Sequence, residues 1–374
     1  MHKKICKVAI AHDWLVAYAG AEIVLENILG LFEQLDLFCI IRDSSNPIFN
    51  CDSVANVYSS SLQKIPFIKK NYKFFASLMP RQVERFNFKK YDLVISSSWA
   101  FCHGLERKET TTKHLAYVHT PMRWAWDMEK EYLSRERFVK FAQPLVRMQI
   151  RKLREWDMIA GQRPDKIIAN SKFVKNRIKK YWSRDSEVIY PPVEVTKGGG
   201  NYESHGAFVS ICRLVTYKRV DLIVRAFNKL PEKKLIIIGT GPELAKLKMI
   251  AKKNIMFIGR VTDQKKFDIL RGAEGFIQAS KEDFGISAVE AQACGIPVIA
   301  FGEGGSLETV IDASLNDNPT GVFFSIQSED ELIKKIIQFS KLEFNKADCI
   351  KNAKKFSGEN FRYKMLDQIN SLTS

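Results

Sequence analysis

The chain has 374 residues, of which 45% are hydrophobic, and a formal net charge of +16, so it is long enough for two domains with separate cores. No run of 18 or more apolar residues occurs, so the sequence predicts no membrane span. The seven cysteines form no C-x-x-C pair and show no zinc spacing, which favours free thiols and no metal site. No nucleic-acid-binding signature accompanies the positive charge, so we favour a membrane surface and a nucleotide diphosphate as partners.

After a short basic start, the apolar run reaches His12 and Asp13 at once, so residues 7–13 predict a first strand and not a signal peptide. A loop leads to a predicted helix over residues 21–34 with one broad apolar face. Gly20 stands where this loop meets the helix. It is either a plain turn or a place where the backbone approaches a ligand closely.

Residues 61–90 contain eight Lys or Arg and a single acid, Glu84, with aromatic and aliphatic residues interleaved. Such a basic amphipathic stretch suits an anionic membrane surface, where each basic residue contributes about 1 kcal/mol. The alternative is a helix that packs on the sheet and leaves its basic face in water.

Two further strands are predicted over residues 91–98 and 113–119, so that His119 ends a strand and Arg123 and Trp124 follow it. A lone histidine at such a place is often structural, and the tryptophans stack on a sugar or simply pack. Beyond a long helix over 135–156 we expect a strand at 165–171 and a helix over 172–182 capped by Ser171, and residues 188–193 are expected to close the first domain. Prolines and glycines then mark a linker at 194–206.

The second half restarts the strand and helix order. A strand over 207–212 precedes Arg213 and Lys218, two cations that suit a diphosphate or simply lie on the surface. A helix over 220–230 and strands over 235–239 and 254–260 come next. The glycine turn after residue 238 lacks the third glycine of a dinucleotide fingerprint. Asp263 could accept hydrogen bonds from guanine, or cap the helix that follows.

Residues 276–306 form a strand, a loop, a helix over 286–294, a second strand over 298–301 and a glycine-rich turn. Ligands in such a unit lie beyond the carboxyl ends of the strands. The backbone amides of residues 284–287 start the helix and attract anions. Glu282 and Glu290 either bind sugar hydroxyls or belong to a solvated acidic turn. Helices over 306–312, 329–339, 346–356 and 359–374 complete the chain.

The segment EDFGISAVEAQACGIPVIA resembles the E-x7-E signature of retaining glycosyltransferases of family 4. Four other segments resemble this family in the right order: HDWLVAYAGAE, YVHTPMRWAWD, the Asn-Ser start before Arg177, and CRLVTYKRVD. In the first of them Ala19 replaces a usual glycine, and the second is similar to O-antigen mannosyltransferases. The resemblance implies an α/β fold of the GT-B class, with two Rossmann-like domains facing each other across a cleft. The domains are expected at 1–193 and 207–356, with a C-terminal helix at 357–374 that crosses back to the N-terminal domain.

The resemblance also assigns roles to residues. Four are expected to be catalytic: His119, Glu282, Arg213 and Lys218. The nucleotide-sugar site is expected to contain Gly20, Arg213, Lys218, Val261, Asp263, Glu282, Phe284, Gly285, Ile286, Ser287 and Glu290. Residues toward the acceptor and sugar are Asp13, Trp14, Tyr18, Arg123 and Trp124. No metal or other cofactor is expected, because cations and helix amides already supply positive charge to the leaving diphosphate.

By the same resemblance, the expected activity is transfer of α-mannose from GDP-mannose, with retention, to a polyprenyl-diphosphate-linked saccharide in O-antigen-type lipopolysaccharide synthesis. The enzyme is expected in the cytoplasm, peripherally on the inner face of the plasma membrane, through residues 61–90. No nucleic acid partner is expected. Alternatives are a UDP- or dTDP-sugar donor such as dTDP-rhamnose, a non-catalytic nucleotide-sugar-binding protein, and a nucleic-acid-binding protein.

Overall fold

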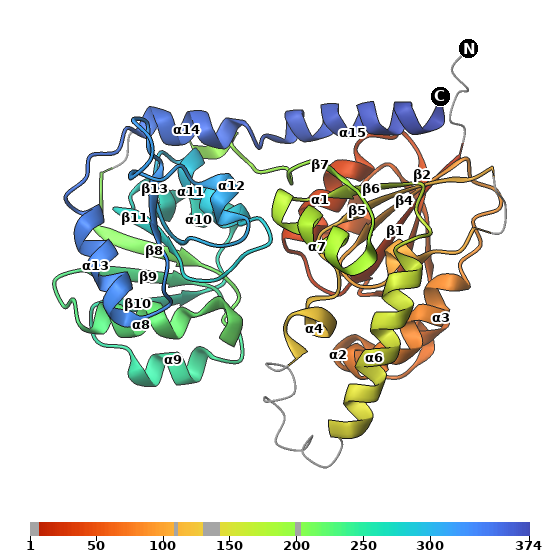
Figure 1. Ribbon diagram of the computed structural model, residues 1–374, viewed down its shortest axis with the longest axis horizontal. Helices are drawn as coiled ribbons and strands as arrows, with labels where there is room; N and C mark the ends of the chain where they lie inside the picture. Colours follow the sequence, from red (N-terminus) through yellow and green to blue (C-terminus); the bar gives the residue numbers. More distant parts are fainter. Residues whose placement is uncertain (1–6, 108–110, 130–142, 199–202) are drawn as a thin grey trace. The chain divides into compact units, whose positions relative to one another are not determined.

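A computed structural model describes residues 7–107, 111–129, 143–198 and 203–374 (Figure 1). The chain divides into two compact units, Met1–Tyr190 with Phe361–Ser374, and Pro191–Asn360. The first unit therefore ends three residues earlier than the sequence predicts. The reason is that Val193 pairs with Ser357 in a parallel bridge and its amide donates to the Phe356 carbonyl, both in the second unit. Four residues of the predicted linker, 199–202, lie outside the described residues.

The first unit contains a parallel sheet of seven strands in the order β3-β2-β1-β4-β5-β6-β7. Its strands are β1 (Val8–Leu15), β2 (Leu35–Arg42), β3 (Val54–Ser59), β4 (Leu93–Ser98), β5 (Lys113–Val118), β6 (Lys166–Ala169) and β7 (Glu187–Val188). The strand order changes direction between β1 and β4. At such a switch point the loops beyond the carboxyl ends of two adjacent strands diverge and leave room for a ligand.

Helices cover both faces of this sheet. They are α1 (Gly20–Leu29), α2 (Ile68–Asn71), α3 (Met79–Glu84), α4 (Arg123–Trp126), α6 (Gln143–Ala160), α7 (Lys172–Trp182) and α15 (Gly358–Thr373). On one face α1 packs with the C-terminal helix α15, which buries Phe361, Met365 and Ile369 in the core of the first unit (Figure 1). This confirms the predicted return of the C-terminal helix. The other face is covered by residues 62–91 and 100–105 and by α4 and α6.

The second unit contains a parallel sheet of six strands in the order β10-β9-β8-β11-β12-β13. Its strands are β8 (Ala207–Ile211), β9 (Lys234–Ile238), β10 (Ile255–Gly259), β11 (Gly275–Gln278), β12 (Val298–Phe301) and β13 (Gly321–Phe324). Its helices are α8 (Val220–Asn228), α9 (Leu244–Ile250), α10 (Asp263–Arg271), α11 (Ile286–Ala293), α12 (Ser306–Thr309), α13 (Glu329–Phe339) and α14 (Lys346–Lys354). The switch point here lies between β8 and β11.

The glycine turn after β9 has a packing role. A Cβ atom added to Gly239, whose φ is +139°, would lie 1.9 Å from the Cys212 carbonyl oxygen, and one added to Gly241 would lie 2.2 Å from that of Leu214. The Leu214 amide in turn donates to the Thr240 carbonyl. The two glycines therefore let this turn support the loop that carries Arg213.

Several predicted elements differ from the structure. The helix predicted over 21–34 ends at Leu29. Residues 61–90 do not form one amphipathic helix but two 3-10 turns, Ser61–Lys64 and Tyr72–Leu78, and the short helices α2 and α3. Ile68 and Val83 from this stretch are buried in the core, whereas Phe67 and Phe74 are 79% and 76% exposed. Much of the helix predicted over 135–156 forms α6, but residues 130–142 lie outside the described residues.

Candidate active site

In the second unit, a lysine and a glutamate from the two strands that flank the switch point form an ion pair. Lys218 follows β8 and Glu282 follows β11. The Lys218 Nζ atom lies 2.6 Å from each carboxylate oxygen of Glu282, and the Ser280 hydroxyl also donates to this carboxylate. Burial acts to lower the pKa of Lys218, but the Glu282 charge outweighs it, so the pKa is raised and the ammonium keeps its charge.

The second glutamate of the E-x7-E pattern, Glu290, also pairs with a lysine. Glu290 lies on α11 and is only 5% exposed, and its Oε1 atom lies 2.7 Å from Lys266 Nζ on α10. Burial raises the pKa of Glu290, while the Lys266 charge opposes this rise. Lys266 also lies 3.1 Å from Asp263. The carboxylate of Glu290 is therefore buried against a cation and not against apolar side chains alone.

The start of α11 lies directly after Glu282. Gly285 has φ +100°, and a Cβ atom there would lie 3.1 Å from the Gln278 amide, so glycine allows this turn. The Phe284 side chain is 3% exposed and its ring packs on Phe356 at 5.3 Å, so only its backbone could face a ligand. The first amides of a helix have no acceptor within the helix, and at residues 285–287 they follow Glu282 closely in sequence.

The remaining predicted residues of this unit have simpler surroundings. Arg213 is exposed, and its guanidinium donates to the Tyr217 hydroxyl at 3.4 Å. Val261 packs at the edge of the core. The suggestion that Asp263 caps α10 is wrong, because the Thr262 hydroxyl accepts from the Lys265 amide and Asp263 is the first helical residue. Its carboxylate is 70% exposed and remains accessible.

In the first unit, His119 directly follows β5. Its Nε2 atom lies 2.9 Å from the Ser97 hydroxyl on β4, which in turn lies 3.1 Å from His12 Nδ1 on β1. Burial and the neighbouring His12 lower the pKa of His119 to about 3, so its imidazole is neutral at physiological pH. His12 and Ser97 were not among the predicted site residues, although they pair with each other in the register of β1 and β4, the two strands at the switch point.

Asp13 corrects the sequence interpretation, which placed it toward the acceptor. Its carboxylate is fully buried and accepts the backbone amides of residues 99–102 at 2.7–2.8 Å, two on each oxygen. Both oxygens are thus used to hold the loop after β4. We assign Asp13 to the architecture of this loop and not to acceptor contact.

Five further predicted residues lie at or near the same strand ends. Gly20 begins α1. Trp14 packs against Tyr72, Trp99 and Phe101, and the Tyr18 hydroxyl donates to Glu26. Arg123 and Trp124 are partly exposed on the short helix α4, and Trp124 packs at the edge of the core. Their roles toward a sugar or acceptor remain predictions.

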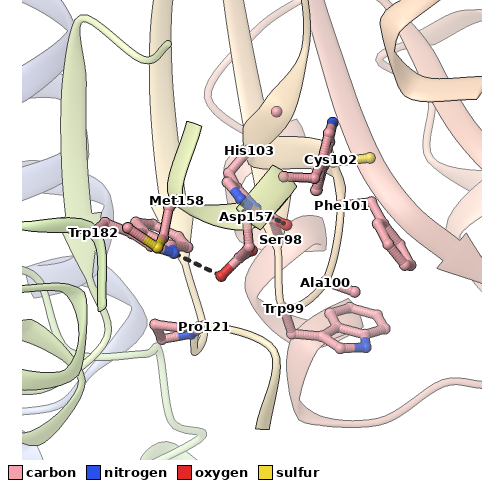
Figure 2. Close-up of polar contacts among 12 residues, drawn as sticks. Ser98, Trp99, Ala100, Phe101, Cys102, His103, Pro121, Asp157, Met158 and Trp182 are labelled. Carbon is pink, nitrogen blue, oxygen red and sulfur yellow. Dashed lines mark hydrogen bonds and ion pairs between the residues drawn. The ribbon is translucent and has the colours of Figure 1, made fainter. Parts of the chain in front are cut away.

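A buried polar cluster lies on the face of the first sheet that α6 covers, and it includes His103 from the loop after β4. Asp157 of α6 is fully buried and accepts the indole N–H groups of Trp126 and Trp182, each at 2.7 Å, and Figure 2 shows Trp182 directed at it. His103 Nε2 lies 3.1 Å from the other carboxylate oxygen, and its ring stacks on Trp182. Sequence patterns gave no sign of this cluster, because its members lie far apart along the chain.

Within the part of the chain that the structure describes, no group of three or more His, Cys, Asp or Glu side chains is placed to hold a metal ion. No helix of that part is both long and apolar enough to cross a membrane.

Two doubly wound parallel sheets, each with polar residues at its switch point, define the GT-B class of proteins. The family model described as Glycosyltransferase Family 4 matches residues 18–197, and the one described as Glycosyl transferases group 1 matches residues 196–356. The chain therefore belongs to the family 4 glycosyltransferases. HepE of Anabaena, crystallised with UDP, is similar in fold, with a TM-score of 0.70, 16% identity and coverage of 98% of this chain and 100% of that one. Sucrose-phosphate synthase of Thermosynechococcus elongatus is also similar in fold, with a TM-score of 0.71 and 16% identity, and the match covers 98% of this chain and 99% of that one.

Among curated proteins, an uncharacterised glycosyltransferase of Methanocaldococcus jannaschii is 30% identical over 54% of this chain and 56% of its own length. A GDP-mannose-dependent monoacylated alpha-(1-6)-phosphatidylinositol monomannoside mannosyltransferase of Corynebacterium glutamicum is 32% identical over 34% of this chain and 35% of its own length. The chain thus spans about half the length of the first of these relatives and about a third of the second.

Proposed function

We propose that the chain is a retaining glycosyltransferase that transfers a sugar from a nucleotide diphosphate. The observation that carries this proposal is the ion pair between Lys218 and Glu282 at the switch point of the second sheet, next to the first amides of α11. Negative charge develops on the diphosphate as the sugar leaves. Arg213, Lys218 and these amides would stabilise it, and such fixed donors act strongly where water is excluded.

The two glutamates would bind the uncharged parts of the donor. Glu282 accepts from Lys218 in the free chain, and its carboxylate would accept from hydroxyls of the transferred sugar once Lys218 turns to phosphate. Glu290 uses one oxygen for Lys266 and would offer the other to the ribose. Carboxylates held by cations in this way keep a fixed orientation, which suits recognition of hydroxyl groups.

We favour GDP-mannose as the donor and a polyprenyl-diphosphate-linked saccharide in O-antigen-type synthesis as the acceptor. Two observations support GDP-mannose: the sequence around His119 resembles O-antigen mannosyltransferases, and two relatives are named as GDP-mannose-dependent mannosyltransferases. The exposed carboxylate of Asp263 could accept from N1 and N2 of guanine. The alternative is a UDP- or dTDP-sugar. A relative in fold was crystallised with UDP, which keeps this alternative open.

A donor panel tests the proposal. Thermal unfolding of the full chain is recorded with GDP, UDP and dTDP and with a sugar derivative of each, and nucleotide release is measured with a lipid extract as acceptor source. We expect GDP to stabilise most, and Asp263→Asn to weaken GDP but not UDP, because an amide cannot accept both guanine donors. Stabilisation by none of the nucleotides would refute the donor site. Binding without turnover would favour a non-catalytic binding protein.

The first unit would meet the membrane that holds a lipid-linked acceptor. Phe67 and Phe74 are exposed within residues 61–90, and Lys64, Lys70 and Lys73 are exposed beside them. Exposed aromatic side chains among basic ones suit the headgroup region of an anionic bilayer. This surface is our candidate for peripheral binding, and we place the enzyme on the cytoplasmic leaflet, where nucleotide sugars would be available.

Changing Lys64, Lys70 and Lys73 to glutamate should weaken binding to anionic vesicles by about a hundredfold, since each basic residue contributes roughly 1 kcal/mol. Sedimentation with anionic and with neutral vesicles measures this. The matched control changes three exposed lysines of the second unit, Lys334, Lys341 and Lys351, which lowers the formal charge equally, from +16 to +10, because each replacement removes two units. An equal loss in the control would indicate binding by diffuse charge, and retention on DNA without vesicle binding would favour a nucleic-acid-binding protein.

A further inference from the structure

Four polar side chains from four different parts of the first unit form a continuous row at the carboxyl edge of its sheet. Glu22 Oε1 lies 3.6 Å from His12 Nε2, His12 Nδ1 lies 3.1 Å from Ser97 Oγ, and Ser97 Oγ lies 2.9 Å from His119 Nε2. Glu22, His12 and Ser97 are 4%, 0% and 0% exposed. Because these three are shielded from water, the charge contact of Glu22 with His12 and the two hydrogen bonds of Ser97 each constrain the next group in the row.

The row has a fixed end. The other carboxylate oxygen of Glu22 accepts the Ala19 amide at 2.8 Å, which holds the side chain in place at the start of α1. The His12 nitrogen that faces Glu22 therefore faces a negative charge. A nitrogen lone pair in that position would be repelled, so His12 carries its proton on Nε2 and presents Nδ1 as an acceptor.

The polarity of the rest of the row follows from this proton. Ser97 donates its single hydroxyl hydrogen to His12 Nδ1, and its oxygen is then left to accept from His119. His119 must carry its proton on Nε2 in order to donate it. The imidazole of His119 is neutral, since its pKa is lowered to about 3, and so its Nδ1 atom bears a lone pair.

The ring of His119 is also held in place. Its backbone amide donates to the Ser98 carbonyl at 2.8 Å. The rings of Trp99 and Tyr117 lie edge-on to the imidazole, with centroids 5.9 and 5.2 Å away. These contacts restrict rotation of the imidazole, so that the tautomer set by Ser97 also sets the direction of the Nδ1 lone pair.

We propose that Ser97, backed by His12 and Glu22, is a positioning residue that keeps His119 in the Nε2–H tautomer and presents its Nδ1 atom as a hydrogen-bond acceptor for a sugar hydroxyl. The identity of that hydroxyl rests on the proposed function, and the tautomer does not. Without Ser97 the two neutral tautomers of His119 would become closer in energy, and a fraction of molecules would present a donor where the sugar needs an acceptor.

The tautomer can be measured directly on the 15N-labelled full chain by long-range 1H–15N correlation of the imidazole nitrogens, with His119 assigned by the loss of its signals in His119→Gln. We expect a protonated Nε2 and an unprotonated Nδ1 in the wild-type protein, and a mixture in Ser97→Ala. The matched control is Ser96→Ala, which removes the neighbouring hydroxyl that bonds His114 on the other face of the same strand. A proton on Nδ1 of wild-type His119 would overturn the proposal, and so would an unchanged spectrum in Ser97→Ala.

Kinetics provide the second readout. Ser97→Ala should lower kcat about tenfold, the factor expected for one lost neutral hydrogen bond, with little change in the donor KM, and Ser97→Thr should restore it because the hydroxyl is kept. Ser96→Ala should leave kcat within about twofold. Equal kcat values for Ser97→Ala and the wild type would overturn the role in positioning. Absence of turnover by the wild type would refute the proposed function, whereas the NMR measurement would still decide the tautomer.

Discussion

Replacing Asp13 by asparagine is expected to lower the free energy of unfolding of the first unit by about 3–5 kcal/mol, the range found when one partner of a buried charged interaction is lost. The carboxylate of Asp13 accepts four backbone amides at 2.7–2.8 Å. Asparagine has nearly the same shape but turns one acceptor into a donor, so two of these amides would face N–H groups. Each buried amide left without an acceptor costs roughly 1–3 kcal/mol.

Urea unfolding followed by tryptophan fluorescence measures this change cleanly. All six tryptophans lie between residues 14 and 182, so the signal reports on the first unit alone. The control is Asp185→Asn, because that side chain is 86% exposed and a surface change should stay within about 0.5 kcal/mol. If Asp13→Asn costs no more than this control, the four hydrogen bonds do not hold the loop after β4.

The same replacement should disturb His119 as well. The loop that Asp13 holds carries Trp99, whose ring packs on both His12 and His119. Asp13 would therefore matter for activity through the loop, without touching a substrate. This explains why the segment around Asp13 resembles a family signature although the Asp13 side chain is buried.

Much of the fold could be predicted from local sequence. The helices α7 and α13 have the predicted bounds, since each begins after a serine whose hydroxyl caps it. The strands β2, β3 and β13 were not predicted. β2 is buried along almost its whole length and so lacks an alternating pattern, β3 is an edge strand with several exposed residues, and β13 has only four residues.

The candidate site was only partly predictable. Lys218 and Glu282 stand out in sequence because each lies in the loop after a strand, and strands that are neighbours in a parallel sheet bring such loops together. The partner of Glu290 was missed, since the contact with Lys266 depends on how α10 packs on α11. The role of Asp13 was wrong because a carboxylate at a strand end can serve either a ligand or its own loop, and sequence alone does not distinguish the two.

Replacing Lys218 by methionine is expected to lower kcat by about 10²–10³, the usual effect of removing one fixed donor from a developing negative charge. Methionine keeps most of the volume and removes the ammonium. The donor KM should also rise, because Glu282 would then be left as an uncompensated negative charge beside the diphosphate. Nucleotide release with the donor identified by the panel measures both constants.

Lys281→Met is the matched control, since Lys281 adjoins Glu282 in sequence but is about half exposed and pairs with Glu303 on the surface. It should leave kcat within about twofold. The double variant Lys218→Met with Glu282→Gln is compared with Glu282→Gln alone, because Glu282 is itself proposed to bind the transferred sugar. If Lys218 only neutralises Glu282, the double variant has the same kcat as Glu282→Gln, whereas a direct role at the diphosphate lowers kcat further. We expect the second outcome, and full activity of Lys218→Met would contradict the proposed site.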